Sequence, residues 1–173
     1  MNNSEETKKP YTHIVHPFGP LYDAQSEVLI LGSLPSVKSR EQNFFYGHPQ
    51  NRFWPLLAAL FDESAPKSIE EKRALALRRH IALWDTIYSC DIVGSSDSSI
   101  RNVVATDLRP ILAGSRVRRI FCNGATSGRY YAKYQQRVLG MSATVLPSTS
   151  PANAAWTMEK LLEAWRVVRE EIG

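Results

Sequence analysis

The sequence predicts an α/β domain with a mostly parallel sheet of about four strands. Short apolar runs of strand length alternate along the chain with longer segments in which apolar residues recur at helical spacing. This alternation is typical of parallel sheets whose strands are joined by crossover helices. With 173 residues, of which 43% are hydrophobic, the chain has the size of a single domain that can bury a substantial core.

The first part of the chain is polar and irregular. We expect residues 1–12 to be a flexible segment, residues 13–173 to form the single domain, and the stretch 12–23 to be an irregular lead-in. The apolar run EVLILG at 27–32 ends in glycine and predicts a buried strand. The segment 33–50 has no periodicity and predicts a long loop, and long loops in compact domains are usually functional.

Two helices and a second strand are expected next. In RFWPLLAALF at 52–61, apolar residues recur at helical spacing. A second helix is expected at 68–80, with Ser68 as its N-cap and Glu71 completing a capping box. The run IALWDTI at 81–87 predicts the second strand, which leads into a turn.

The second half of the chain repeats the order of strand, loop and helix. In sequence, we expect a serine-rich loop at 90–102, a short helix at 104–114, a strand at 117–124, a helix at 125–140, a strand with a loop and helix start at 143–156, and an amphipathic helix at 157–172.

Composition disfavours several classes of protein and site. No apolar run approaches the roughly 20 residues of a membrane span, and the polar start lacks the apolar region of a secretory signal, so we expect a cytoplasmic protein with no membrane partner. Cys90 and Cys122 are the only cysteines, which indicates neither a zinc ribbon nor a disulfide scaffold. The four histidines lack the spacing of metal ligands, so we expect no metal.

The chain carries a modest positive charge. It has 21 Lys and Arg against 17 Asp and Glu, a formal net charge of +4, which fits either a polyanionic partner or an ordinary solvated surface. Lys38, Arg40 and Arg52 gather in and beside the predicted long loop, so this loop is one candidate for contacts with phosphates.

Ligands of parallel α/β sheets bind outside the carboxyl ends of the strands. This rule places four loops on one rim, at 32–51, 85–101, 123–128 and 147–154. The loops contain no GxGxxG, P-loop or GxSxG pattern, which disfavours dehydrogenases, kinases and serine hydrolases. They are poor in carboxylates and rich in Ser, Thr, Asn, Pro and aromatic residues, and this composition suits hydrolysis of an N-glycosidic bond.

Three segments carry a family resemblance: LILGSLPSVKSREQNFFYGHPQNRFW at 29–54, LWDTIYSCDIVGSSDSSI at 83–100 and LPSTSPANA at 146–154. From about residue 13 to its end, the chain resembles the uracil-DNA glycosylase superfamily, and most closely its hypoxanthine-DNA (deoxyinosine) glycosylase branch. The resemblance implies a three-layer α/β/α sandwich and extrusion of the target nucleotide from the duplex. It also implies double-stranded DNA with a deaminated base as partner and no cofactor, and we expect a monomer.

The first superfamily motif lines the pocket beside the scissile bond. The resemblance places it on Gly32, Ser33, Leu34, Pro35 and Ser36. Leu34 stands where similar enzymes have a water-orienting Asn, and a leucine cannot orient water. Asn51, at the end of the same loop, is our candidate catalytic residue, with a role as N-cap of the following helix as the alternative.

Aromatic residues of the same segment are candidates for stacking on the base. Tyr46 aligns with the stacking aromatic of the superfamily, although Phe44 or Phe45 can take this role, while Phe53 and Trp54 are expected to be core. Further pocket candidates, each with an alternative as a turn, capping or hydrogen-bonding residue of the fold, are His48, Asp85 and Asn123.

The second superfamily motif falls on the LPSTSPANA segment and implies a loop that enters the minor groove. Its candidate contacts with base or DNA are Ser148, Ser150, Pro151, Ala152 and Asn153. A small wedge residue at Ala152 or Asn153 favours bases that are already poorly paired. Lys38, Arg40 and Arg52 are expected to contact DNA, and because no lysine in these motifs is placed to form a Schiff base, we expect a monofunctional enzyme that leaves an abasic site.

Two other hypotheses stay open. Leu34 also suits a non-catalytic nucleic-acid-binding module with the same fold, and an unrelated α/β hydrolase would turn over esters and ignore DNA. Hypoxanthine is the first expected substrate, but its rank against uracil, xanthine and alkylated bases depends on a few donors and acceptors in the pocket.

Overall fold

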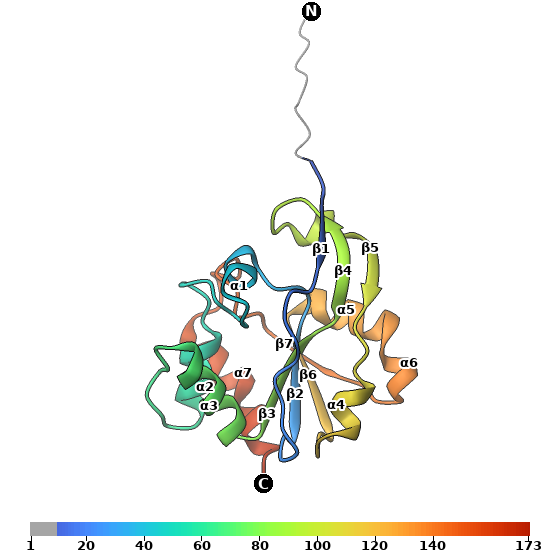
Figure 1. The fold of residues 1–173 in the computed structure, drawn as a ribbon. Coiled ribbons are helices and arrows are strands. Elements are labelled where there is room, and N and C mark those ends of the chain that lie inside the picture. Colours follow the sequence, from blue (N-terminus) through green and yellow to red (C-terminus); the bar gives the residue numbers. More distant parts are fainter. Residues whose placement is uncertain (1–9) are drawn as a thin grey trace, which may run out of the picture.

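The computed structural model describes residues 10–173, and its centre is a sheet of four parallel strands (Figure 1). The strands lie in the order β3-β2-β6-β7, and each neighbouring pair is parallel. Their bounds are β2 Val28–Gly32, β3 Ile81–Asp85, β6 Arg119–Asn123 and β7 Thr144–Leu146. The prediction of a mostly parallel four-stranded sheet is confirmed.

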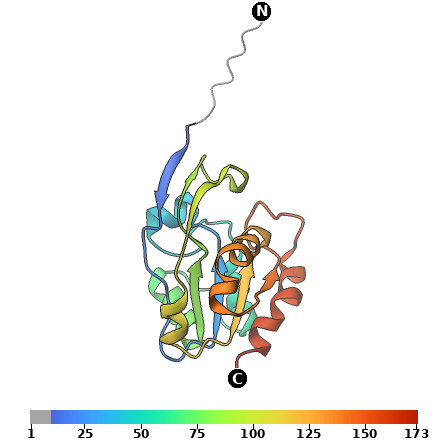
Figure 2. The same ribbon diagram turned by 90° about the vertical axis from the view of Figure 1, so that its right-hand side faces the viewer.

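Helices cover both faces of this sheet. In Figure 1, α2, α3 and α7 lie on one side of the strands and α4, α5 and α6 on the other, and Figure 2 views the sheet from the side of the second group. The bounds are α2 Phe53–Leu60, α3 Ile69–Arg78, α4 Arg109–Ala113, α5 Ala125–Tyr134, α6 Gln136–Leu139 and α7 Met158–Glu170. The expected three-layer α/β/α sandwich is therefore confirmed.

A second sheet of three antiparallel strands was not predicted. It consists of β1 Thr12–Val15, β4 Ile87–Ile92 and β5 Arg101–Ala105 in the order β1-β4-β5. Only Thr86 separates β3 from β4, and its backbone N–H donates to Gly32 O at 2.9 Å before the chain enters the second sheet. One continuous stretch of extended chain thus serves both sheets.

The second sheet corrects three expectations. The stretch 12–23, expected to be irregular, contains β1, and the serine-rich stretch 90–102 contains the end of β4 and the start of β5. The helix expected at 104–114 begins only at Arg109. Pro110 lacks a backbone N–H and is tolerated only in the first helical turn, so the helix cannot start a turn earlier.

Two predicted segments are only partly irregular. Of the segment expected to be flexible, residues 1–9 lie outside the described residues, whereas Thr12 is the first residue of β1. The long loop expected at 33–50 contains the short helix α1 Val37–Gln42. Ser36 caps this helix, because its hydroxyl accepts a hydrogen bond from Ser39 N at 3.2 Å.

The predicted N-cap of α3 is confirmed. The Ser68 hydroxyl accepts a hydrogen bond from Glu71 N at 3.1 Å. The Glu71 carboxylate accepts from Lys67 N at 2.6 Å, so the return bond of the capping box goes to the residue before the cap.

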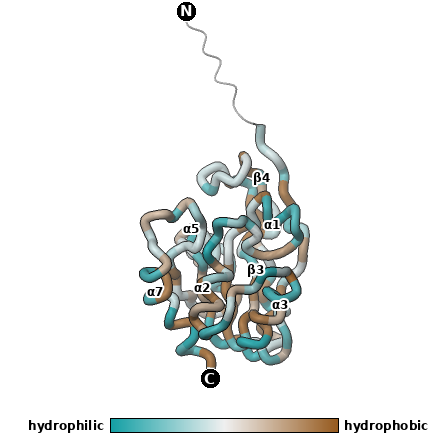
Figure 3. The backbone as a smooth tube through the Cα atoms, turned by 90° about the vertical axis from the view of Figure 1, so that its left-hand side faces the viewer, coloured by the Kyte–Doolittle hydropathy of each residue, from teal (hydrophilic) through white to brown (hydrophobic). Residues whose placement is uncertain are grey.

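The core lies between the parallel sheet and its two helical layers. Residues 28–31 of β2 are fully buried, as are Phe121 of β6 and Trp165 of α7. Figure 3 shows hydrophilic and hydrophobic residues alternating along the outer helices, which is the pattern of helices that bury one face. Within residues 10–173, none of the helices has the length and apolar character that crossing a membrane requires.

The carboxyl ends of the four parallel strands fall along one edge. Gly32, Asp85, Asn123 and Leu146 end β2, β3, β6 and β7 in turn, and the register pairs Gly32 with Asp85 and Asn123 with Leu146. The four segments predicted to form the rim follow these residues, but the segment 85–101 is not a simple loop, because β4 begins at Ile87, and the segment 123–128 already contains the start of α5.

Candidate active site

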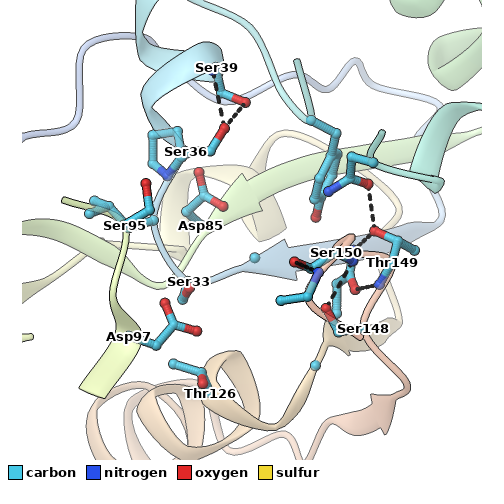
Figure 4. A pocket seen from close by; sticks show the side chains of 18 of the residues that line it. Ser33, Ser36, Ser39, Asp85, Ser95, Asp97, Thr126, Ser148, Thr149 and Ser150 are labelled. Atoms are coloured by element: carbon cyan, nitrogen blue, oxygen red, sulfur yellow. Dashed lines mark hydrogen bonds between the residues drawn. The ribbon is translucent and has the colours of Figure 1, made fainter. Parts of the chain in front are cut away.

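A cavity of about 460 Å³ opens at the carboxyl edge of the parallel sheet, and all four rim loops line it. In Figure 4, Ser33, Asp85, Asp97, Thr126 and Ser148 surround one common space. The volume lies in the range of small-molecule sites, roughly 300–1,000 Å³. The edge that the sequence designates for ligand binding therefore has a pocket of suitable size.

Most of the residues assigned to the base pocket line this cavity. They are Gly32, Ser33, Leu34, Pro35, Ser36, Phe45, Tyr46, Asn51, Asp85, Asn123 and Ser148. Of the residues assigned to DNA contacts, Arg40, Ser150 and Ala152 line it as well. The lining, as far as residues 10–173 define it, does not include His48, Lys38, Arg52, Pro151 or Asn153.

Gly32 lies against the carboxylate of Asp85 at the base of the cavity. A Cβ atom at position 32 would stand 2.5 Å from Asp85 Oδ1 and 3.4 Å from the hydroxyl oxygen of Tyr46. The approach to Asp85 is impossible unless the carboxylate moves, whereas the distance to Tyr46 is an ordinary van der Waals contact. The glycine that opens the first motif is therefore required because the Asp85 carboxylate packs against its backbone.

Asp85 is held by a buried histidine that the sequence analysis did not assign to the site. His16 Nε2 lies 2.6 Å from Asp85 Oδ2, and the side chains are 0% and 5% exposed. The His16 ring packs between Phe18 and Trp84, with ring centroids 4.6 and 4.3 Å away. His16 follows β1 in the stretch expected to be irregular, so no pattern in the sequence pointed to it.

Tyr46 offers one face of its ring to the cavity. The other face stacks on Phe53, with ring centroids 4.0 Å apart and an interplanar angle of 26°. Tyr46 has a φ of 53°, which is uncommon for a bulky residue and is held by this packing. Burial, with a further contribution from the charge of Asp85 and a smaller opposing one from the Asn123 amide, raises the pKa of Tyr46, so its hydroxyl stays protonated.

The other aromatic residues of this segment form core. Phe44, Phe45, Phe53 and Trp54 are all buried, and Phe44 stacks on Trp54 with ring centroids 5.9 Å apart. The Trp54 indole donates to Phe45 O at 3.0 Å. Phe45 also reaches the cavity wall, so the flat surface there belongs to Tyr46 and Phe45, and Phe53 and Trp54 are core as predicted.

Asn51 lines the cavity and stands one residue before Arg52, which is the N-cap of α2, so the role of N-cap considered for Asn51 is wrong although its side chain does bond to the start of the helix. Its carbonyl oxygen accepts from Phe53 N at 3.0 Å, at the start of α2, and from the Thr149 hydroxyl at 2.8 Å. Both acceptor positions of Oδ1 are therefore used by the protein. The amide nitrogen Nδ2 has no hydrogen-bond partner among residues 10–173, so Asn51 can act toward a ligand as a donor.

Thr149 joins the rim loops and was missed by the sequence analysis. Its side chain is fully buried, its backbone N–H donates to Asn123 Oδ1 at 3.0 Å, and its hydroxyl accepts from Asn123 Nδ2 at 3.0 Å. Arg52 N donates to Thr149 O at 3.1 Å. Asn123, expected to contact the base, thus holds the 147–154 loop with its carbonyl and one of its two amide hydrogens.

Arg52 anchors the same loop. Its guanidinium donates to the backbone oxygens of Ser150 and Asn153 at 3.1 and 3.0 Å, and it also bonds to Trp156 O. Asn153 Nδ2 in turn donates to Ser148 O at 3.0 Å. Arg52 and Asn153, both assigned to DNA contacts from the sequence, therefore fix the shape of the loop, in which Ala152 is exposed.

The first turn of α5 forms part of the cavity wall. Gly124 has a φ of 97°, and a Cβ atom there would lie 3.1 Å from Ser148 Cβ. Both the backbone conformation and this close approach favour glycine at position 124. The buried Ser127 hydroxyl donates to Leu31 O at 2.8 Å and Gly32 O at 3.2 Å, which fixes the helix to the end of β2. Ala125 and Thr126 line the cavity, so the first turn of this helix faces the ligand space and favours anions.

Two basic residues and one histidine complete the set predicted from the sequence. Arg40 lines the cavity and donates to Pro35 O at 3.1 Å, and burial lowers the pKa of its guanidinium. Lys38 is exposed beside Glu41, with 3.6 Å between Nζ and Oε2. His48 Nδ1 accepts from Gln50 N at 3.1 Å, which is the structural hydrogen bond weighed against an acid role.

The cavity presents neutral hydrogen-bonding groups, the aromatic surface of Tyr46 and Phe45, the guanidinium of Arg40 and the carboxylates of Asp85 and Asp97. No group of three or more His, Cys, Asp or Glu side chains within residues 10–173 is placed to hold a metal ion. Such a site can bind a planar polar molecule between Tyr46 and the polar groups of Asn51 and Asp85.

Comparisons with known proteins agree with this arrangement. The family model described as the uracil DNA glycosylase superfamily matches residues 20–169. A curated hypoxanthine DNA glycosylase from Methanosarcina acetivorans is 33% identical over 153 residues, which cover 87% of this chain and 95% of the relative. Another protein of the same name, from Methanosarcina barkeri, is 34% identical over 143 residues, 79% of this chain and 86% of the relative. The solution NMR structure of a uracil-DNA-glycosylase-like protein from Methanosarcina acetivorans superimposes with a TM-score of 0.76 at 32% identity, covering 89% of this chain and 96% of that chain.

Proposed function

The chain belongs to the uracil DNA glycosylase superfamily, and on that premise we propose that it hydrolyses the N-glycosidic bond of deaminated bases in double-stranded DNA, with hypoxanthine as first substrate. The observation that carries the proposal is that one cavity at the carboxyl edge of the sheet brings the amide of Asn51 and the free face of Tyr46 together. The names of both curated relatives favour hypoxanthine, and uracil and xanthine are further candidates.

The reaction needs the target nucleotide outside the base stack, because the glycosidic carbon is out of reach within the duplex. The extruded base enters the cavity and stacks on the face of Tyr46 that Phe53 leaves free. Base–aromatic stacking contributes about 1–3 kcal/mol in comparable sites. The protein supplies the rest by positioning and by hydrogen bonds.

In the chemical step, the oxygen of water bonds to C1′ of the deoxyribose, the base leaves with the electrons of the N-glycosidic bond, and the proton that the water loses balances the negative charge of the departing base. Asn51 Nδ2 donates a hydrogen bond in the cavity, where it either positions the attacking water through that water's oxygen or stabilises negative charge on the departing base. The Asn51 carbonyl oxygen serves the protein, so the amide is oriented before substrate arrives. Leu34, which also lines the cavity, contributes apolar surface only.

Contacts with the DNA backbone come from groups at the mouth of the cavity. Arg40, the hydroxyl of Ser150 and the first turn of α5 are available to phosphates, and Lys38 lies on the exposed side of α1. The loop 148–153 enters the minor groove with Ala152 at its tip, held in shape by Arg52. The small tip favours bases that are already poorly paired.

We expect a monofunctional enzyme that acts as a monomer and leaves an abasic site. A Schiff-base mechanism needs a lysine amine at the sugar carbon, whereas Lys38 is exposed, pairs with Glu41 and lies outside the cavity lining. The reaction as proposed uses groups of this chain and water, and no cofactor.

A panel of duplexes that differ in one base tests the proposal. Each carries inosine, deoxyuridine, deoxyxanthosine or an undamaged base at the same position, and is incubated with the protein and then heated in alkali. Strand scission at inosine after heating supports the glycosylase. Binding of the inosine duplex by the protein without strand scission supports a non-catalytic binding module. Neither binding nor scission with any of the duplexes contradicts both hypotheses.

A further inference from the structure

One proton of the attacking water has no acceptor among the groups assigned so far. Asn51 cannot take it, because both acceptor positions of its oxygen are used by the protein and its nitrogen only donates. Leu34, at the motif position where similar enzymes have a water-orienting Asn, has no polar atom in its side chain. A protein group that accepts this proton must therefore come from elsewhere in the cavity lining.

The described lining residues include two carboxylates, and these lie at different depths. The Asp85 side chain is 5% exposed, its Oδ2 lies 2.6 Å from His16 Nε2, and its Oδ1 lies against Gly32 on the side of the Tyr46 hydroxyl. Asp97 is an exposed residue, and its carboxylate makes no hydrogen bond or ion pair with the rest of residues 10–173. Asp85 thus borders the inner end of the cavity and Asp97 its mouth.

The second sheet carries Asp97 to the first motif. In Figure 1 this sheet lies beyond the carboxyl ends of the parallel strands. The Leu34 side chain packs against a cluster on β4 that consists of Ile87, Cys90 and Ile92. The chain then passes through a short 3₁₀ helix, Asp97–Ser99, before it returns as β5. The sheet that covers Leu34 therefore also supplies a carboxylate to the cavity that Leu34 lines.

We propose that Asp97 is the general base of the reaction and that its carboxylate accepts the proton of the water that attacks C1′. The inference rests on the proposed function, because it assigns a further catalytic residue to the same site. The water oxygen bonds to C1′, the electrons of the N-glycosidic bond leave with the base, and the water proton passes to Asp97. Asp97 then releases this proton to solvent and the departed base takes one up, so charges and protons balance.

The place of Asp97 fits the direction from which the water approaches. Water bonds to C1′ on the face of the sugar opposite the departing base. The base stacks on Tyr46 at the inner end of the cavity, so the sugar, which stays joined to the DNA strand, lies nearer the mouth. In Figure 4, Asp97 points into the cavity on the side of Ser33 and Thr126. A base at the mouth can reach this water, whereas Asp85 lies on the side of the departing base.

Hydrogen bonds within the turn between β4 and β5 hold the backbone of Asp97. Val93 N donates to Ser99 Oγ at 2.9 Å, and the Ser99 hydroxyl donates to Ser96 O at 2.7 Å. Ile100 N donates to Asp97 O at 3.3 Å. The carboxylate is thus presented from a backbone that is fixed on both sides, as a general base within reach of one water requires.

A carboxylate at the mouth of this cavity opposes the binding of DNA. Phosphates carry the same sign of charge, so Asp97 lowers the affinity for any duplex. The same charge stabilises the positive charge that develops on the sugar as the base departs. The proposed role therefore predicts opposite effects of Asp97 on binding and on catalysis.

Substitution of Asp97 separates these two effects. Asp97→Asn and Asp97→Ala remove the proton acceptor, and we expect single-turnover excision of hypoxanthine at saturating protein to fall about 100-fold, the lower end of general-base contributions. Affinity for an undamaged duplex should stay equal or increase, because one repulsive charge is gone. Ser98→Ala, in the same turn but outside the described cavity lining, is the matched control and should leave excision unchanged.

Azide distinguishes a general base from a residue that only holds the turn. Azide bonds to C1′ without losing a proton, so it needs no base, and the Asp97 carboxylate of the unchanged protein repels it. We expect azide to raise base release by Asp97→Ala several-fold over chloride at equal ionic strength. The strand should then carry an azide group at C1′, detected by mass spectrometry, and the unchanged protein should show neither effect.

The outcomes separate failure of this inference from failure of the proposed function. Absence of hypoxanthine excision by the unchanged protein overturns the proposed function itself. Excision by both Asp97 variants at the rate of the unchanged protein overturns the role of Asp97 alone. A fall in excision that azide does not reverse also overturns that role, because altered loop structure then explains the fall. If Asp97→Ala does not fold by circular dichroism, the isosteric Asp97→Asn replaces it in the azide experiment.

Discussion

The hydroxyl of Thr149 donates a hydrogen bond of 2.8 Å to the carbonyl oxygen of Asn51, across 98 positions of the sequence. The same hydroxyl accepts from Asn123, so one buried side chain joins the end of β6 to the loops that follow β2 and β7. The consequence for Asn51 is directional: with its oxygen bound, only its N–H groups remain for a ligand. This geometry leads to the first two predictions.

Replacement of Asn51 should separate its structural contribution from its catalytic one. Asn51→Ala removes the acceptor at the start of α2 and the donor in the cavity, and Asn51→Asp keeps the acceptor alone. We expect both variants to lose about 100- to 1,000-fold in single-turnover excision of hypoxanthine, as for removal of one positioned donor. Asn51→Ala alone should also lose about 1 kcal/mol of unfolding free energy, measured by urea denaturation. Excision within a few-fold of the parent in both variants would rule out the catalytic role.

Removing the hydroxyl of Thr149 should loosen the site without touching the substrate. Thr149→Val keeps the shape but leaves Asn51 and Asn123 without this partner, and we expect a loss of about 1–3 kcal/mol in unfolding free energy. Excision should fall less than in Asn51→Ala, because the amide is present but no longer held. Thr149→Ser, which keeps the hydroxyl, is the matched control, and equal stability of the two variants would contradict the network.

Adding a methyl group at Gly32 should displace the Asp85 carboxylate. A Cβ atom there meets Asp85 Oδ1 at 2.5 Å, whereas at Gly19 it meets nothing within 4 Å. Gly32→Ala should therefore reduce excision by at least 10-fold, roughly the factor that corresponds to 1.4 kcal/mol, while Gly19→Ala leaves it unchanged. Steady-state excision of hypoxanthine from a duplex measures both, and normal activity of Gly32→Ala would contradict the close approach.

The three basic residues assigned to DNA contacts should differ in their salt dependence. Arg40 and Lys38 are available to phosphates, so Arg40→Gln and Lys38→Gln should each reduce the slope of log affinity against log salt by about 1. Arg52 is bound to backbone oxygens of the loop, so Arg52→Gln should weaken binding at every salt concentration with little change in slope. Fluorescence anisotropy of a labelled duplex between 50 and 200 mM salt measures these quantities, and a reduced slope for Arg52→Gln would indicate a phosphate contact instead.

The parallel sheet was predictable because its strands carry their signal locally. Each is a short apolar run, and β2 and β6 end in residues that stop a strand, Gly32 and the pair Asn123–Gly124. The antiparallel sheet has no such signal. Its strand β4 follows β3 after one residue, and β1 is stabilised by pairing with β4 rather than by its own sequence.

Site residues were predictable from the sequence where they lie in a family motif. They were not predictable where their role depends on hydrogen-bond partners that are distant in the sequence. Gly32, Tyr46, Asn51 and Asp85 lie in recognisable segments and line the cavity. The roles of His16 and Thr149 arise from partners that are 69 and 98 positions away, respectively. No local pattern encodes such contacts, so a buried histidine in an irregular stretch and a threonine among serines could not be distinguished from their neighbours.

The most direct test of the account is to measure the products released by the unchanged protein from a duplex with a single inosine, under single-turnover conditions. We predict free hypoxanthine by liquid chromatography and mass spectrometry, with one equivalent of abasic strand that stays intact until it is heated in alkali. Release of no base, or cleavage of the strand without alkali, would contradict a monofunctional glycosylase.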